Sequence, residues 1–249
     1  MLKKRIIPIL TYSNEELVKS IQFGSRKYIG DPLNAVRIFN EKFVDEIILL
    51  DIGNENRDEF KINYPFLKKL LNECFMPVTY GGGIKTFEDA KKIFDLGVDK
   101  ISLNSIIFKN VEIIEKLVSY FGSQSIVACF DIKKNISGKY CLYNYKENKI
   151  FNYEFKQCIQ KIIDLGIGEI LINSVDRDGM MNGVEKDLLK DLNFSVPLIY
   201  SGGVGKLEDL QDGFKYKLEG IGCSSFFCFY GENKSVLISY PFKDLDRVR

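Results

Sequence analysis

The sequence predicts an α/β fold, a single (β/α)8 TIM barrel built from two half-barrel repeats. Short apolar, β-branched runs alternate with amphipathic stretches along all 249 residues, as in parallel strands joined by helices. The length suits one such barrel, and no Pro/Ser-rich linker divides the chain. The segment PVTYGGGI at 77–84 returns as PLIYSGGV at 197–204. We therefore expect one domain, 1–249, with half-barrels at about 1–122 and 123–249.

Each expected element has its own pattern. The stretches 34–43, 86–97 and 112–122 are predicted helices, because their apolar residues recur every three or four positions. The segment 133–155 alternates apolar with polar residues and is long for a strand-to-helix connection, so it predicts a small hairpin over the top of the barrel. The eight expected barrel strands are 5–11, 46–51, 77–80, 100–103, 125–131, 169–174, 197–200 and 220–224.

Composition excludes several classes of function. With 35 basic and 34 acidic residues, nothing indicates a nucleic-acid or membrane-surface partner. No apolar run approaches the ~18 residues of a membrane span, and the apolar stretch at the start is too short for a signal peptide. The six cysteines include no CxxC pair, which favours buried, reduced thiols in a cytoplasmic protein. The chain has no histidine, the commonest general base and metal ligand, and we expect neither a metal nor another cofactor.

Two glycine-rich turns predict phosphate sites. Gly82 and Gly83 follow a strand and precede a helix start, so their N–H groups can approach an anion, and Asn104 and Ser105 can add donors. A ligand with a phosphate at each end fits two such sites, whereas the alternative is that the glycines only make tight turns. The second copy would use Ser201, Gly202, Gly203, Ser224 and Ser225, with Asp178 and Gly179 of the DRDG turn on the same rim.

Four charged residues begin barrel strands: Arg5, Glu46, Lys100 and Glu169. Strand period places Arg5 on the same face as Thr11, at ~3.3 Å per residue about 20 Å below it. Two positive and two negative groups at one level would neutralise each other. They form either an ionic plug in the barrel floor or a gate that passes a small polar molecule.

The repeat breaks at one position that matters for chemistry. The strand of the second copy ends with Asp131, whereas that of the first ends with Thr11. Thr11 does not ionise near neutral pH, so a symmetric acid/base pair of carboxylates is missing. Asp51 could substitute as an acid, or could accept hydrogen bonds from loop amides.

Segments along the whole chain resemble HisF, the cyclase subunit of imidazole glycerol phosphate synthase. They are KRIIPIL, DEIILLDI, GGGIKT, DKISLNS, FGSQSIV, GEILINSVDRDG and SGGVG. The resemblance implies a barrel whose bottom docks the glutaminase HisH. Ammonia then crosses the gate and barrel to attack the bisphosphate phosphoribulosyl-formimino-AICAR phosphate, with two aspartates as acid and base.

Matching residues carry these roles over. The gate matches Arg5, Glu46, Lys100 and Glu169, and the docking acid matches Asp99. The catalytic set becomes Asp131, the first-loop Lys19, and Thr11 in place of the other aspartate. The surrounding LTYSNEELVKS and Met180 also depart from the cyclase pattern.

Three further segments resemble a paralogous branch, the WbuZ-type barrels associated with glycosyl amidation. They are YIGDPLNAVRIFNEK (28–42), ECFMP (73–77) and LISYP (237–241). That resemblance implies ammonia delivery, with a HisH-like glutaminase, to an ATP-dependent amidotransferase that makes an acetamidino group on a surface sugar. A divergent histidine-pathway cyclase and a scaffold that only switches on its glutaminase remain alternatives.

Overall fold

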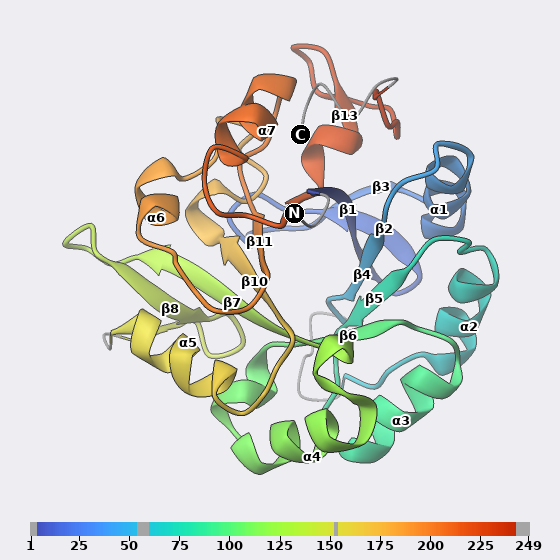
Figure 1. Cartoon of the computed structure of the whole chain (residues 1–249). Coiled ribbons are helices and arrows are strands. Elements are labelled where there is room, and N and C mark those ends of the chain that lie inside the picture. Colours follow the sequence, from blue (N-terminus) through green and yellow to red (C-terminus); the bar gives the residue numbers. More distant parts are fainter. Residues whose placement is uncertain (1–3, 54–59, 152–153, 243–249) are drawn as a thin grey trace.

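A computed structural model describes residues 4–53, 60–151 and 154–242, and its centre is a closed barrel of eight parallel strands (Figure 1). The barrel closes because β12 pairs with β1 and β7 pairs with β10. The predicted fold class is confirmed. The barrel strands are β1 (Arg5–Ser13), β4 (Ile47–Asp51), β5 (Val78–Gly81), β6 (Lys100–Leu103), β7 (Ile126–Lys134), β10 (Glu169–Ser174), β11 (Leu198–Ser201) and β12 (Gly220–Cys223).

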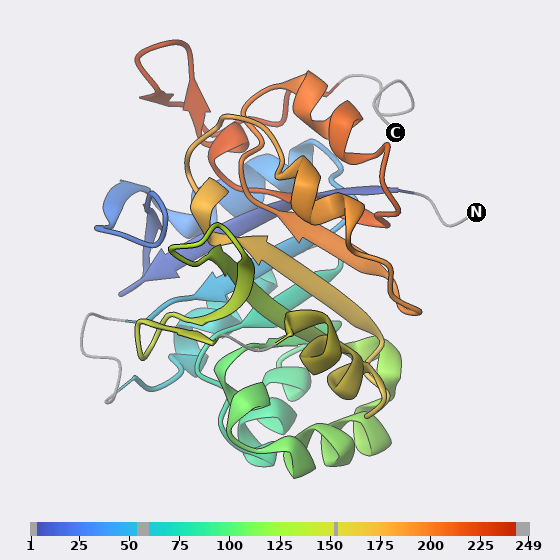
Figure 2. The ribbon, with the colours of Figure 1, turned by 90° about the vertical axis from the view of Figure 1, so that its left-hand side faces the viewer.

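Helices of the described part surround this barrel on the outside (Figures 1 and 2). The helix predicted at 34–43 begins earlier, because the Asp31 side chain accepts the Leu33 N–H and Pro32 takes the first helical position. The helix at 87–95 begins with a reciprocal capping box between Thr86 and Asp89. The helices are α1 (Pro32–Glu41), α2 (Tyr64–Asn72), α3 (Phe87–Asp95), α4 (Val111–Phe121), α5 (Phe155–Ile163), α6 (Lys186–Lys190) and α7 (Leu207–Gly213).

Strand alternation divides the apolar residues into two layers. The larger layer packs between the strands and the helices. A smaller cluster fills the barrel lumen, and it consists of Ile7, Ile9, Ile48, Val127, Cys129, Leu171 and Ile199, with Leu50 against it. The lumen between the two barrel ends is therefore packed and mainly apolar.

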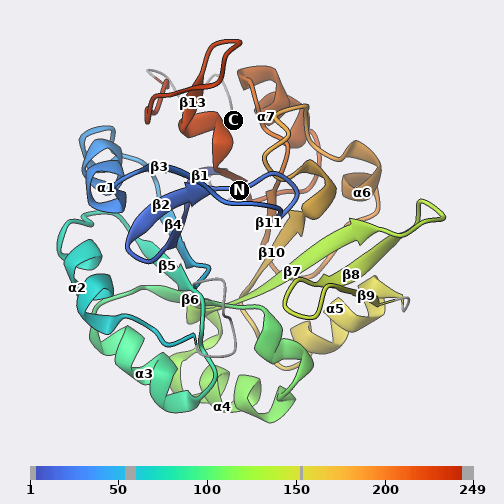
Figure 3. The same ribbon diagram turned by 180° about the vertical axis from the view of Figure 1, so that it is seen from behind.

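Short antiparallel strands lie at the end of the barrel where the parallel strands finish (Figures 2 and 3). The hairpin predicted within 133–155 is present as β8 (Tyr140–Asn144) and β9 (Lys149–Phe151), and it extends from β7. A ribbon of β2 (Glu16–Lys19) and β3 (Lys27–Gly30) follows β1 and was not predicted. The remaining short elements are β13 (Phe229–Tyr230), β14 (Ser235–Val236), η2 (Ser105–Phe108), η3 (Ser123–Ser125), η4 (Val175–Arg177) and η5 (Ser225–Phe227).

The sequence repeat also appears as a repeated contact. A carboxylate oxygen of Asp99 accepts the N–H of Val78 at 2.8 Å, and one of Glu219 accepts the N–H of Leu198 at 2.8 Å. The two pairs stand at the same offset as the glycine-rich turns. All six cysteines are free thiols. Within the described residues, no helix has the length and apolar character to cross a membrane.

Candidate functional site

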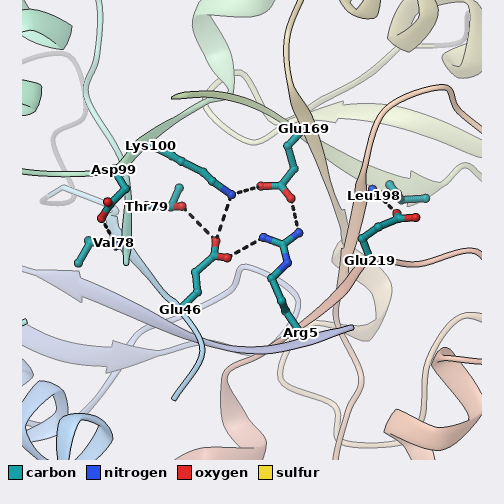
Figure 4. Close-up of polar contacts among 9 residues, drawn as sticks. All are labelled: Arg5, Glu46, Val78, Thr79, Asp99, Lys100, Glu169, Leu198 and Glu219. Carbon is teal, nitrogen blue, oxygen red and sulfur yellow. Dashed lines mark hydrogen bonds and ion pairs between the residues drawn. The ribbon is translucent and has the colours of Figure 1, made fainter. Parts of the chain in front are cut away.

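The four charged residues predicted from the strand starts meet at one end of the barrel, here called the floor (Figure 4). Arg5 lies 2.6 Å from Glu46 and also contacts Glu169. Lys100 lies 2.7 Å from Glu169 and 3.7 Å from Glu46. Each cation therefore contacts both carboxylates, and the four side chains form a closed ring of alternating charge, the charged ring.

Burial makes this ring dependent on all its members. The side chains of Glu46 and Glu169 are only 6% and 5% exposed, whereas those of Arg5 and Lys100 are 20% and 23% exposed. Burial by itself lowers the pKa of Arg5, but the hydrogen bonds and charges of Glu169 and Glu46 outweigh it and raise that pKa. Removing one member would leave charge uncompensated in a poorly hydrated place.

Polar residues stand between the ring and the apolar lumen. The hydroxyl of Thr79 donates to Glu46 at 3.3 Å, and both Thr79 and Ser102 are buried. Asp99, the predicted docking residue, is exposed on the same end, where one of its oxygens caps the start of β5 (Figure 4). A role of Asp99 in docking stays a prediction.

At the opposite end, here called the mouth, Asp131 points into the lumen from β7. Its two oxygens accept amide hydrogens from Asn104 at 3.0 Å and Asn173 at 3.2 Å. Burial raises the pKa of Asp131 to about 7, although the two amides act to lower it. Asn173 was missed from sequence, yet it has the same strand parity as Glu169 and Leu171, which would have placed it on the lumen side.

Thr11 and Lys19 are joined across the start of the β2–β3 ribbon. The Thr11 hydroxyl donates to the carbonyl oxygen of Val18 at 2.5 Å and accepts from Nζ of Lys19 at 3.2 Å. Nζ of Lys19 also donates to the carbonyl of Ile9 at 3.2 Å. Burial lowers the pKa of Lys19. Thr11 thus has a structural task at the position where a carboxylate was expected.

The ribbon reaches across the mouth to the DRDG turn. The N–H of Gln22 donates to the carbonyl of Asp178 at 2.9 Å, and its side-chain amide donates to that of Asp176 at 2.9 Å. The Asp178 carboxylate accepts from Ser20 and Phe23 at 3.4 Å each. Gly179 is necessary here, since a Cβ would lie 2.3 Å from the carbonyl oxygen of Ser20.

The second predicted phosphate site forms a pocket at the mouth. All seven residues predicted for it line the pocket, which also contains Met181, Val204, Gly222 and Cys223. Close packing restricts Gly203 further, because its φ is +85° and a Cβ would lie 2.1 Å from the carbonyl oxygen of Gly183. The tight-turn interpretation of this glycine and the phosphate interpretation are thus compatible.

The first predicted phosphate site is arranged differently. At Gly82, φ is +125° and a Cβ would lie 2.1 Å from the carbonyl oxygen of Asp51. At Gly83, φ is +68° and a Cβ would lie 2.1 Å from the ring of Phe60. The Asn104 amide, expected as an anion donor, is engaged by Asp131 and by the Cys129 carbonyl. Ser105 begins the short helix η2.

Asp51 does not join Asp131 in the lumen. Its neighbours Ile48 and Leu50 face the lumen, so strand alternation turns Asp51 outward, next to Tyr12. One oxygen accepts the N–H of Gly53 at 3.0 Å, and burial raises the pKa of Asp51 to about 6. The hydrogen-bond-acceptor interpretation of Asp51 therefore agrees with its position, and the substitute-acid interpretation does not.

Comparisons with known proteins identify the family. Residues 5–233 match the family model described as "Histidine biosynthesis protein". A relative from Pseudomonas aeruginosa, named "Putative imidazole glycerol phosphate synthase subunit hisF2", is 41% identical over 97% of both chains. The chain belongs to the HisF family. HisF from Alkaliphilus metalliredigens, named imidazole glycerol phosphate synthase subunit HisF, is 37% identical over 86% of this chain and 85% of its own. The barrel fold is consistent with this membership.

Proposed function

We propose that this HisF-family barrel docks a HisH-like glutaminase on its floor and conducts ammonia for amidation of a surface sugar, with little or no cyclase activity. The observation that carries the proposal is Thr11. Its hydroxyl is committed to Val18 and Lys19, where the family resemblance calls for a catalytic carboxylate. The charged ring, in contrast, is complete.

Features of the floor and lumen support the proposal of ammonia transfer. The cations of the ring are partly exposed on the floor, so they can meet a partner, while the carboxylates are buried beneath them. Thr79 and Ser102 offer polar groups just inside the ring. Beyond them the apolar lumen favours the neutral NH₃ molecule over ammonium, because burial of an unpaired charge is costly.

Among the residues that the structure describes, the lumen side of the mouth presents one carboxylate, Asp131, where the family resemblance implies two. Asp131, with a pKa of about 7, can exchange a proton near neutral pH. Asp51 is turned away from the lumen, and Thr11 does not ionise in this range. A single carboxylate cannot be the acid on one side of a substrate and the base on the other at the same time.

The sugar acceptor is inferred from the three segments at 28–42, 73–77 and 237–241 that resemble the glycosyl amidation branch. In this proposal the barrel passes ammonia to a separate, ATP-dependent amidotransferase. That third protein would convert an N-acetyl group into an acetamidino group.

The test compares glutamine-dependent with ammonia-dependent amidation by the three-protein system. We expect Lys100→Met with Glu169→Gln, which keeps the ring neutral, to lose most of the glutamine-dependent reaction and to retain the ammonia-dependent one. Free ammonia reaches the acceptor without the barrel. An equal loss of both reactions in a folded variant would mean that the ring is only a structural plug.

The second candidate is a genuine cyclase, which the names of the relatives and the pKa of Asp131 favour. The chain supplied with ammonia and the cyclase bisphosphate should then turn over at ordinary rates. Our proposal expects turnover slower by a factor of about 10² to 10⁴, the usual effect of losing an acid/base group. If the chain stimulates the glutaminase but transfers no ammonia, it is instead a scaffold that only switches on its glutaminase.

A further inference from the structure

Phe43 combines an unusual backbone with almost complete exposure. It follows α1 and its capping residue Lys42, and its φ is +52°. Its side chain is 88% exposed. The left-handed region is unfavourable for a bulky residue, and glycine is the usual choice just past the end of a helix. Because the phenyl ring of Phe43 is not buried, packing within the chain does not compensate for the energetic cost of this backbone conformation.

Phe75 stands beside it on the next helix-to-strand loop and is 87% exposed. Asn40 holds the two loops together. Its side-chain oxygen accepts the N–H of Phe75 at 3.1 Å, and its backbone carbonyl accepts the N–H of Phe43 at 3.0 Å. The side-chain amide of Asn40 also donates to the carbonyl of Glu73. Of the aromatic side chains in the described ranges, Phe43 and Phe75 are the two most exposed.

Both residues lie at the floor. Loops that lead from a helix into a barrel strand lie at the end where the strands begin. Phe43 precedes the ring member Glu46 by three residues, and Phe75 precedes β5, whose Thr79 donates to Glu46. The backbones that carry the two aromatic side chains are thus held on the floor, the end of the barrel at which the charged ring lies.

We propose that Phe43 and Phe75 are the aromatic anchors that bind the glutaminase subunit beside the charged ring. This inference rests on the proposed function, since the ring must be covered by the ammonia source if ammonia is not to escape into water. Exposed aromatic residues on a backbone that hydrogen bonds already hold in place are typical of residues that dominate a binding interface. If a second copy of this chain bound to the same surface, the charged rings of both copies would be covered and both entrances would be blocked. The occupant is therefore the glutaminase, which would offer apolar pockets for the side chains of Phe43 and Phe75.

The test measures the Kd for the purified glutaminase, by calorimetry, with Phe43→Gly and Phe75→Ala. We expect each Kd to rise roughly tenfold to a hundredfold, the usual effect of removing an interface anchor. Phe43→Gly should at the same time raise the Tm of the isolated barrel by about 2–4 °C, since glycine suits its backbone. The control is Tyr230→Ala, which removes a 70% exposed aromatic residue on β13 and should leave the Kd unchanged.

The outcomes separate this inference from the proposed function. If the wild-type chain binds the glutaminase and both variants bind it with the same Kd, the inference about the two anchors is wrong. The proposal of an ammonia channel is then unaffected. A fall in the Tm of Phe43→Gly would also overturn the inference, because Phe43 would then be packing within its own chain. A wild-type dimer that Phe43→Gly dissociates would replace the glutaminase with a second copy. No binding by the wild-type chain would overturn both proposals.

Discussion

The hydroxyl of Thr11 donates to the carbonyl oxygen of Val18 at 2.5 Å, which ties the end of β1 to the β2–β3 ribbon. Lys19 donates back to the same hydroxyl at 3.2 Å. A carboxylate at position 11 has no proton to give at neutral pH and would face the Val18 carbonyl unfavourably. The residue that removes the expected acid/base group therefore also closes the loop over the mouth.

The first prediction concerns this contact. Thr11→Val keeps the shape of the side chain but loses both hydrogen bonds, so we expect the free energy of unfolding to fall by about 1–3 kcal/mol. The amides of β2 and β3 should exchange with solvent faster, as hydrogen-exchange mass spectrometry can measure. Thr11→Ser keeps the hydroxyl and serves as the control. Unchanged exchange in Thr11→Val would show that the ribbon is held by its other contacts alone.

The second prediction concerns the stability of the charged ring. Lys100→Met leaves the buried Glu46 and Glu169 with Arg5 as their shared cation, and should lower the free energy of unfolding in urea by about 3 kcal/mol. Adding Glu169→Gln removes the excess negative charge and should restore more than half of that loss. If the double variant is no more stable than Lys100→Met, charge balance is not what holds the ring together.

The third prediction concerns the second phosphate site. Gly203→Ala places a Cβ against the Gly183 carbonyl oxygen and should weaken the binding of inorganic phosphate, measured by calorimetry, at least about tenfold. Gly138→Ala is the matched control, because its φ is also positive at +77° and a Cβ there meets no atom within 4 Å. Crystals grown in sulfate should show an anion against Gly203 and Ser225. A wild-type chain that binds no phosphate would leave the glycines as turns only.

The fourth prediction concerns pH. Burial raises the pKa of Asp131 from 3.8 to about 7, so between these values the folded chain holds a proton that the unfolded chain releases. The free energy of unfolding should therefore fall as the pH rises through this window, by a few kcal/mol at most. The sign follows because the unfolded state binds fewer protons there.

Asp131→Asn should remove that part of the pH dependence. The amide group that replaces the carboxyl group meets the amide donors of Asn104 and Asn173. This mismatch changes the free energy of unfolding by the same amount at every pH. The relevant quantity is therefore the difference between the two unfolding curves across pH 4 to 7. The burial of Asp51 contributes equally to both proteins and cancels. Parallel curves would mean that Asp131 titrates at the same pH in the folded and unfolded chains.

Much of the architecture follows from the sequence alone. The eight strands, their parallel order and the twofold repeat follow from local patterns, namely apolar period, glycine turns and an offset of 120 residues. The charged ring could also be foreseen. Its members Arg5, Lys100 and Glu169 each begin a barrel strand and Glu46 immediately precedes one, and a closed barrel brings all strand starts to one end.

Other features depended on contacts between distant parts of the chain. Asp51 and Asp131 both end strands, but only strand pairing shows that Asp51 faces the helices while Asp131 faces the lumen. The clamp from Asn173 to Asp131 joins residues 42 positions apart. The β2–β3 ribbon was not predicted because its closure depends on Thr11 and on the DRDG turn, more than 150 residues away. Local patterns determine which elements form, whereas the direction and partners of each side chain are decided only when the barrel closes and brings remote strands together.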